Sequence, residues 1–206
     1  MPIECEFKWK AHNTEDFSRM LGVIKKYFTG HITGPANILN QDAYLDTPQQ
    51  LWSAHKTALR IRCANGRFEA TAKSQTKMMN GKAVRQEETL SLHQAHNLPQ
   101  ALELLKTKST WLGLPLAGVQ MIFTITNRRQ TYQLTSGADV YELALDDCLL
   151  EVAGRCKELK EIELELKKGN EEAFSLFAGI LQKNCGLSVP EKSKVESARA
   201  LLEENK

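Results

Sequence analysis

Apolar and polar residues alternate along several stretches of the chain, which is typical of strands with one buried face. Strands are expected at Ile3–Lys10, Ile38–Leu45, Ala58–Cys63, Phe68–Ser74, Val84–Leu92, Met121–Thr126, Arg129–Leu134, Val140–Leu150 and Lys157–Lys168. Asn65-Gly66 predicts a hairpin, because these two residues tolerate the positive φ angles of a tight turn. Most strands follow one another without an intervening helix, so the sheet should be largely antiparallel.

Helical spacing of apolar residues, or flanking cap residues, marks four other stretches. They run from residue 13 or 14 to about Tyr27, over Leu98–Lys106, from Glu171 to about Asn184, and over Lys192–Glu203. Asn13 or Thr14 can cap the first of these helices, and Asn170 can cap the third. Gly186 is placed to end the third helix.

The polar faces of the strands carry charges at every second position, and residues i and i+2 of a strand share a face. The residues that share a face are Glu4, Glu6 and Lys8; Arg60 and Arg62; Arg85 and Glu87; Glu142 and Asp146; and Glu161, Glu163 and Glu165. For any one strand, a water-exposed sheet face explains such a pattern. Its repetition, with like charges side by side, favours a surface that binds ligands of the opposite charge.

Acidic and basic clusters on separate strands suit two kinds of ligand. Carboxylate oxygens are the preferred ligands of Mg²⁺ and Mn²⁺, and arginine binds phosphate through a bidentate fork. A metal-bound polyphosphate uses both. If the sheet curls so that the charged faces line a channel, its apolar faces point outward, where the predicted helices can cover them.

Composition and charge exclude several classes of protein. The net charge of +2 gives no overall attraction to nucleic acid or to a membrane surface, so we expect neither partner. The 206 residues suffice for one sizeable domain, expected to span 1-206. No secretory signal and no membrane-spanning run of about 20 apolar residues is evident. The five cysteines lack C-x-x-C spacing, which indicates reduced thiols in a cytoplasmic protein.

The order of several short motifs resembles that of the CYTH family, the triphosphate tunnel metalloenzymes. The chain begins with Glu4-x-Glu6-x-Lys8, similar to the family's E-x-E-x-K. Further similar segments are Tyr44-Leu45-Asp46-Thr47-Pro48, Leu59-Arg60-Ile61-Arg62, Thr71-Ala72-Lys73, Arg85-Gln86-Glu87, Arg129-Gln130-Thr131-Tyr132, Glu142-Leu143-Ala144-Leu145-Asp146, Glu161-Ile162-Glu163-Leu164-Glu165-Leu166 and Ser193-Lys194. The resemblance is greatest to bacterial inorganic triphosphatases of the family. Those often carry a further helical CHAD domain, which we do not expect here.

The resemblance implies an α+β fold, an eight-stranded antiparallel β-tunnel (barrel) with helices packed on the outside. It also implies hydrolysis of inorganic triphosphate (tripolyphosphate) to pyrophosphate and phosphate with Mg²⁺ or Mn²⁺. The implied metal site consists of Glu4, Glu6, Glu161 and Glu163, with Asp146 supporting the metal or its waters. The implied phosphate-binding residues are Lys8, Arg60, Arg62, Lys73, Arg85, Arg129 and Lys194. The catalytic residues are expected to be Glu4, Glu6 and Lys8.

Several alternatives remain open. The chain departs from the family pattern at Leu45, in place of an aromatic residue, and at Asn127, in place of a lysine. Glu165 either contacts the metal or its water or ends a solvated strand, and Glu87 either orients a basic side chain or pairs with an arginine. The alternative functions are a class IV adenylate cyclase that makes cyclic AMP from ATP, a thiamine triphosphatase, and a non-catalytic polyphosphate-binding module. No motif predicts a purine pocket, which favours tripolyphosphate over ATP. A monomer and a homodimer are both compatible with the sequence.

Overall fold

The computed structural model of the chain describes residues 3–74, 77–79 and 82–203, and within them all side chains except those of 3, 4, 77–79 and 82–86. The strands are β1 (Ile3–Ala11), β2 (His31–Asp46), β3 (Ala58–Ala64), β4 (Arg67–Lys73), β5 (Lys77–Met79), β6 (Lys82–Ser91), β7 (Thr110–Trp111), β8 (Leu114–Pro115), β9 (Gln120–Ser136), β10 (Asp139–Val152) and β11 (Arg155–Lys168). The helices are α1 (Thr14–Tyr27), α2 (Leu51–Ala54), α3 (Leu98–Lys106), α4 (Glu171–Cys185) and α5 (Lys194–Glu203). No helix in this part of the chain is long and apolar enough to cross a lipid bilayer.

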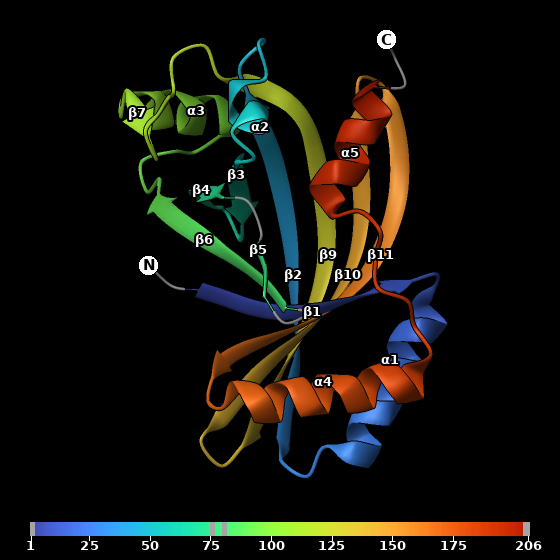
Figure 1. Cartoon of the computed structure of the whole chain (residues 1–206). Helices are drawn as coiled ribbons and strands as arrows, with labels where there is room; N and C mark the ends of the chain where they lie inside the picture. The colour runs from blue at the N-terminus through green and yellow to red at the C-terminus, as the bar shows by residue number, and fades with distance from the viewer. Residues whose placement is uncertain (1–2, 75–76, 80–81, 204–206) are drawn as a thin grey trace.

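Nine of the strands form one antiparallel sheet in the order β1-β11-β10-β9-β2-β3-β4-β6-β5, and β1 also pairs with β6. Eight strands, from β1 to β6 in this order, therefore follow one another in one curved antiparallel sheet, which together with the helices confirms the predicted α+β fold class (Figure 1). The contact between β1 and β6 joins only Ile3–Glu6 to Ala83–Gln86. Beyond this seam the described parts of the two strands do not pair, so the sheet is not closed there.

Local sequence signals produce the turns and helix ends that were expected from them. The side chain of Asn13 accepts a hydrogen bond from the backbone N–H of Asp16, 3.1 Å away, and so caps α1. Gly186, with a φ of 64°, ends α4. Asn65 and Gly66, with φ angles of 51° and 73°, form the turn between β3 and β4.

The sheet differs from the prediction in β9, a single strand where two were expected, Met121–Thr126 and Arg129–Leu134. Asn127 and Arg128 interrupt the apolar pattern, but both continue the strand and pair with β2. β2 itself begins at His31, earlier than expected. The short elements α2, β5, β7 and β8 have no counterpart in the sequence pattern, because so few residues show no periodicity.

Apolar residues on the outer face of the sheet pack under helices, as the sequence predicts. The largest cluster joins Trp9 of β1 and Ile162 of β11 to Met20 of α1 and Phe174 of α4. Those two helices lie together at one end of the molecule (Figure 1). A second apolar cluster lies between β3 and β4 on one side and the helices α2 and α3 on the other.

Helix α5 is the exception, because it packs on the inner face. Its Ala198 belongs to an apolar cluster with Ile125 of β9 and Leu150 of β10. Ile125 pairs with Leu150 on one side and with Asp42 of β2 on the other. Residues directly opposite each other in an antiparallel sheet share a face, so α5 lies on the face that carries Asp42. The helix therefore occupies one end of the tunnel, where it lies across the upper parts of the long strands (Figure 1).

Candidate active site

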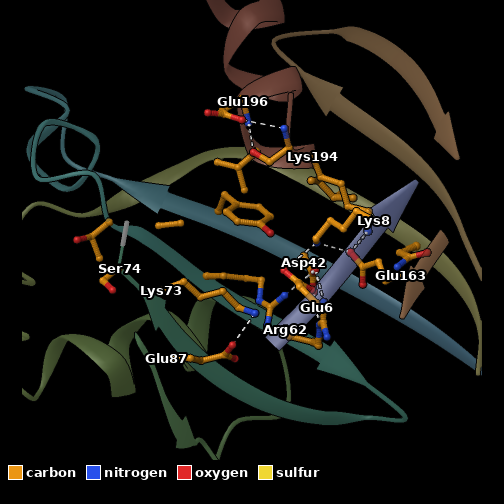
Figure 2. Close-up of a pocket in the computed structure, with 18 of the residues that line it drawn as sticks. Glu6, Lys8, Asp42, Arg62, Lys73, Ser74, Glu87, Glu163, Lys194 and Glu196 are labelled. Atoms are coloured by element: carbon orange, nitrogen blue, oxygen red, sulfur yellow. Dashed lines mark hydrogen bonds and ion pairs between the residues drawn. The ribbon is translucent and has the colours of Figure 1, made fainter. Parts of the chain in front are cut away.

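The inner face of the sheet and the beginning of α5 line a cavity of about 1510 Å³ (Figure 2). The expected site residues that line it are Glu6, Lys8, Arg60, Arg62, Lys73, Arg129, Glu163 and Lys194. Asp146 and Glu161 do not line the cavity, since they are 0% and 1% exposed, but both contact Lys194, which does. Glu4 and Arg85 occupy paired positions on β1 and β6, and their side chains lie outside the described part of the chain.

Three carboxylates from β10 and β11 surround the ammonium group of Lys194. Its Nζ atom lies 2.5 Å from Oδ2 of Asp146, 2.9 Å from Oε2 of Glu161 and 3.0 Å from Oε1 of Glu163. Asp146 and Glu161 are directly opposite each other in the sheet, and Glu163 follows on the same face. Sequence reasoning expects Lys194 at the phosphate chain, but here its ammonium group lies among the expected metal ligands.

Two more cations, Arg129 of β9 and Lys8 of β1, pair with the carboxylates of this cluster. Arg129 donates from Nε and Nη2 to the two oxygens of Asp146, and from Nη2 to Oε2 of Glu163. Each of these three hydrogen bonds is 2.6 Å long. Lys8 of β1 lies 2.5 Å from Oε1 of Glu163 and 3.3 Å from Oε1 of Glu6. Lys8 and Glu163 are directly opposite each other between β1 and β11, so the sheet register places this pair. Glu163 therefore has three cationic neighbours.

The electrostatic balance favours the charged forms of Glu163, Asp146 and Lys194. Burial alone would raise the pKa of the Glu163 carboxyl, but the surrounding cations, first among them Lys194, outweigh it and hold that pKa well below its usual range. Asp146 behaves in the same way. Burial would raise the pKa of its carboxyl, but Lys194 and Arg129 outweigh burial and hold that pKa below its usual value. Burial would lower the pKa of Lys194, but the neighbouring carboxylates raise it well above its usual range.

A second charged cluster lies on β2 and β3, around a residue that sequence reasoning missed. Asp42 is 4% exposed and accepts two hydrogen bonds of 2.7 Å from Arg62, while Nη1 of Arg60 lies 3.4 Å from its Oδ2. Burial would raise the pKa of the Asp42 carboxyl, but the two arginines hold it below its usual value. The position of Asp42, two residues before Tyr44 in a recognised motif, was the available signal, since both share a face of β2.

Two glutamates whose roles were left open form ion pairs. Glu87 of β6 lies 2.6 Å from Nζ of Lys73 (Figure 2), and its charge also helps to raise the pKa of Arg60. Glu165 lies 2.7 Å from Nζ of Lys167 on its own strand and lines the cavity. Both carboxylates thus balance cations at the edge of the site.

Three buried polar atoms of cavity-lining residues have no hydrogen-bond partner among the described residues. They are Nε of Arg60, Oδ1 of Asn127 and Nε of Arg199. Buried polar groups are normally hydrogen-bonded, so an unsatisfied guanidinium N–H in a cavity indicates a place for an anionic ligand. The departure at Asn127 therefore places an uncharged amide at the wall of the site, 3% exposed.

The acidic cluster has the hard oxygen ligands that Mg²⁺ and Mn²⁺ prefer. Oε2 of the buried Glu161 lies 2.9 Å from Nζ of Lys194 as an ion pair, yet neither carboxylate oxygen accepts a hydrogen bond of normal geometry from a described residue. Within the described residues, no three acidic, histidine or cysteine side chains stand at metal-binding spacing. The contacts of Lys194, 2.5 to 3.0 Å long, are wider than the ~2.0–2.1 Å between Mg²⁺ and oxygen. The residues fit a divalent ion in chemistry, and their spacing is that of an ammonium ion.

Comparison with known proteins gives both a family and a fold. Residues 2–198 match the CYTH domain. The structure is similar to a proposed adenylyl cyclase from Hippeastrum that reveals a dominant triphosphatase activity, with a TM-score of 0.63 at 17% identity over 98% of this chain and 96% of that chain. A protein from Pyrococcus horikoshii OT3 gives 0.62 at 21% identity over 98% and 99% of the two chains. A proposed adenylate cyclase from Bacillus halodurans gives 0.62 at 23% identity over 96% and 98%. At these identities the three structures establish the shared fold.

Proposed function

The chain belongs to the CYTH domain family, and on that basis we propose that it is a metal-dependent triphosphatase whose preferred substrate is inorganic triphosphate. The observation that carries this proposal is the presence of two unlike clusters in one cavity. The acidic cluster around Lys194 can hold a divalent cation, and the arginine pair on β3 faces the same space. Only a ligand with both a metal and several phosphate oxygens uses both clusters.

Arginines and lysines of the cavity would bind the phosphate chain. Arg60 and Arg62 hold their guanidinium groups against Asp42, and Nε of Arg60 is a buried donor without a partner among the described residues. Lys73, which forms an ion pair with Glu87, extends this basic surface. These groups are in place before the substrate arrives, so they neutralise phosphate charge without reorganisation during the reaction.

Glu6, Glu163, Glu161 and Asp146 would hold Mg²⁺ or Mn²⁺, together with Glu4 of the same strand as Glu6. When bound, the ion supplies charge neutralisation at the phosphate and lowers the pKa of a water molecule. Catalysis of phosphoryl transfer rests mainly on such positioning and charge stabilisation.

Among the described glutamates assigned to the metal site, Glu6 is the best candidate to take the proton of the attacking water. Glu163 has three cations around it and a lowered pKa, which makes it a weak base. Glu161 does not line the cavity. Glu6 lines the cavity and has Lys8 as a neighbour at 3.3 Å. The water oxygen would attack the terminal phosphorus, the proton would pass to a carboxylate oxygen of Glu6, and pyrophosphate would leave.

The substrate assignment is tested by measuring phosphate release from tripolyphosphate, ATP, thiamine triphosphate and pyrophosphate, each with Mg²⁺ and with Mn²⁺. We expect tripolyphosphate to give the highest kcat/KM, because the cavity's charged groups recognise phosphate alone. Pyrophosphate should be poor, since it is too short to reach both clusters. Products from ATP are separated by chromatography. Cyclic AMP and pyrophosphate as the main products would identify a cyclase, preference for thiamine triphosphate would identify a thiamine triphosphatase, and binding without turnover would leave a polyphosphate-binding protein.

A further inference from the structure

The ammonium group of Lys194 lies in the position that a bound cation would take. Three carboxylate oxygens from two strands lie within 3.0 Å of its Nζ atom. The carboxylates themselves are held by the sheet, because Asp146 and Glu161 are paired across β10 and β11. The lysine, by contrast, comes from α5, a separate element that packs onto the sheet. The carboxylates that bind the cation are therefore fixed by the sheet, and the cation belongs to a side chain of a helix.

The three carboxylates differ in how much they depend on Lys194. Asp146 also binds Arg129, and Glu163 also binds Arg129 and Lys8. Glu161 is 1% exposed and has no other ion pair within the described residues. An ionised carboxylate buried without a counter-charge is strongly destabilising. The ammonium group of Lys194 is the counter-charge of Glu161 among the described residues, and a metal ion bound to the same oxygens would take its place.

The attachment of Lys194 allows its ammonium group to leave without unfolding the helix. Lys194 is the first residue of α5, and Ser193 and Glu196 cap that end through reciprocal hydrogen bonds of 3.2 and 2.8 Å. The helix is also held by Ala198, which packs in the apolar cluster of the inner face. The flexible four-carbon stem of lysine can move while the capped end and the apolar contacts stay in place.

From these contacts we propose that Lys194 is a built-in competitor of the divalent metal. Its ammonium group neutralises Asp146, Glu161 and Glu163 while no metal is bound, and a metal ion that takes these oxygens displaces it into the cavity. The displaced ammonium group then faces the phosphate chain, as the sequence motif suggested. This proposal rests on the proposed function for the identity of the metal ligands, and its consequence for substrate binding rests on that function for the phosphate chain.

A consequence is that metal and triphosphate should bind cooperatively. The metal releases a cation that the phosphate chain can bind, and the phosphate chain holds that cation away from the metal ligands. Linkage makes the effect reciprocal, so triphosphate should raise metal affinity by the same factor as metal raises triphosphate affinity.

The first test measures Mn²⁺ binding by calorimetry without substrate, in the full-length wild type, Lys194→Met and Lys192→Met. Lys192 is the matched control, because it is exposed, carries the same charge and lies two residues away. We expect Lys194→Met to bind Mn²⁺ roughly 5- to 150-fold more tightly, the usual range of coupling between two ligands. Lys192→Met should equal the wild type. Equal or weaker binding by Lys194→Met would overturn the proposal.

A second test uses the wild type alone and does not depend on the folding of a variant. Lysines are acetylated with an amine-reactive ester, and the labelling rates of Lys194 and Lys192 are compared by peptide mass spectrometry. Without metal, Lys194 should react slowly, since its side chain is only 15% exposed and its ammonium group is paired. Mn²⁺ should raise its labelling several-fold and leave Lys192 unchanged. No change at Lys194 at saturating Mn²⁺ would contradict displacement. Neither test measures hydrolysis. A protein without triphosphatase activity would therefore refute the proposed function, while Mn²⁺ binding and lysine labelling would still show whether the metal displaces Lys194.

Discussion

Arg62 binds Asp42 through two parallel hydrogen bonds, from Nε to Oδ1 and from Nη2 to Oδ2, both 2.7 Å long. Arg60, two residues earlier on the same strand, faces the same carboxylate at 3.4 Å. One buried acid thus holds side by side two guanidinium groups that would otherwise repel each other. We regard Asp42 as a positioning residue, since it acts on phosphate only through the arginines.

Removal of the Asp42 carboxylate should destabilise the fold. Asp42→Ala leaves two largely buried guanidinium groups without their counter-charge, a loss that typically costs about 3–5 kcal/mol. Urea unfolding measures the change. Asp147→Ala is the control, because it breaks the more exposed pair with Lys160, 2.8 Å long, and such pairs contribute about 1 kcal/mol or less. Equal losses in the two variants would contradict the role of Asp42.

Stability should fall in acid, partly because of Asp42. Its pKa is lowered in the folded protein, so the unfolded chain takes up the proton first, near pH 3.9. The stabilising contribution is therefore present above about pH 4 and is lost as the pH falls through the folded-state pKa. Asp146 and Glu163 add to the slope in the same direction. Unfolding free energies measured between pH 3 and 6 should fall less steeply for Asp42→Asn than for the wild type. Identical slopes would exclude this contribution.

Arg129 and Arg128 should differ sharply although they are adjacent. Arg129 lines the cavity and binds Asp146 and Glu163, whereas Arg128 is exposed. Because a preorganised charge in an active site is worth a factor of about 10²–10³ in kcat, Arg129→Ala should reduce tripolyphosphate hydrolysis to that extent. Arg128→Ala should retain wild-type kinetics. Similar losses in both would show that charge number, and not position, determines activity.

The acidic residues should be required for turnover, and their amide variants should still fold, although loss of the buried Glu163 charge lowers the free energy of unfolding. Glu6→Gln and Glu163→Gln each keep the size of the side chain but remove a carboxylate, so phosphate release from tripolyphosphate should be lost at ordinary Mg²⁺ or Mn²⁺ concentrations. Circular dichroism should show the wild-type secondary structure. EDTA should abolish wild-type activity, and added metal should restore it. Full activity of either variant, or activity unchanged by EDTA, would refute the assigned metal site.

Tripolyphosphate should stabilise the protein by filling its basic cavity. Binding at 100 times Kd contributes about 2.7 kcal/mol to the free energy of unfolding, which a thermal melt detects as a rise in Tm. The rise should be smaller in Arg60→Ala, because the Nε atom of Arg60 is a buried donor without a described partner. Arg128→Ala should show the full rise. Absence of a shift in the wild type at saturating ligand would argue against a phosphate-binding cavity.

Much of the site could be read from the sequence, because strand geometry is local. A period of two residues per face places Glu6 beside Lys8, Arg60 beside Arg62 and Glu161 beside Glu163, wherever the strands go. The same locality explains the cap of α1 at Asn13, which depends on a residue only three positions away. The β-tunnel followed from the family resemblance and from the repetition of charged strand faces.

The tertiary structure decided which charges meet. Lys194 and Asp146 are 48 positions apart, and Lys8 and Glu163 are 155 positions apart. No periodicity within a strand determines such pairs, because they depend on strand order, on register and on how α5 packs. α5 occupies the inner face because that face becomes apolar towards one end of the tunnel, at Ile125 and Leu150. The sequence therefore determined the chemistry of each face, and only the packing of α5 against the sheet decided that an ammonium group lies among the expected metal ligands.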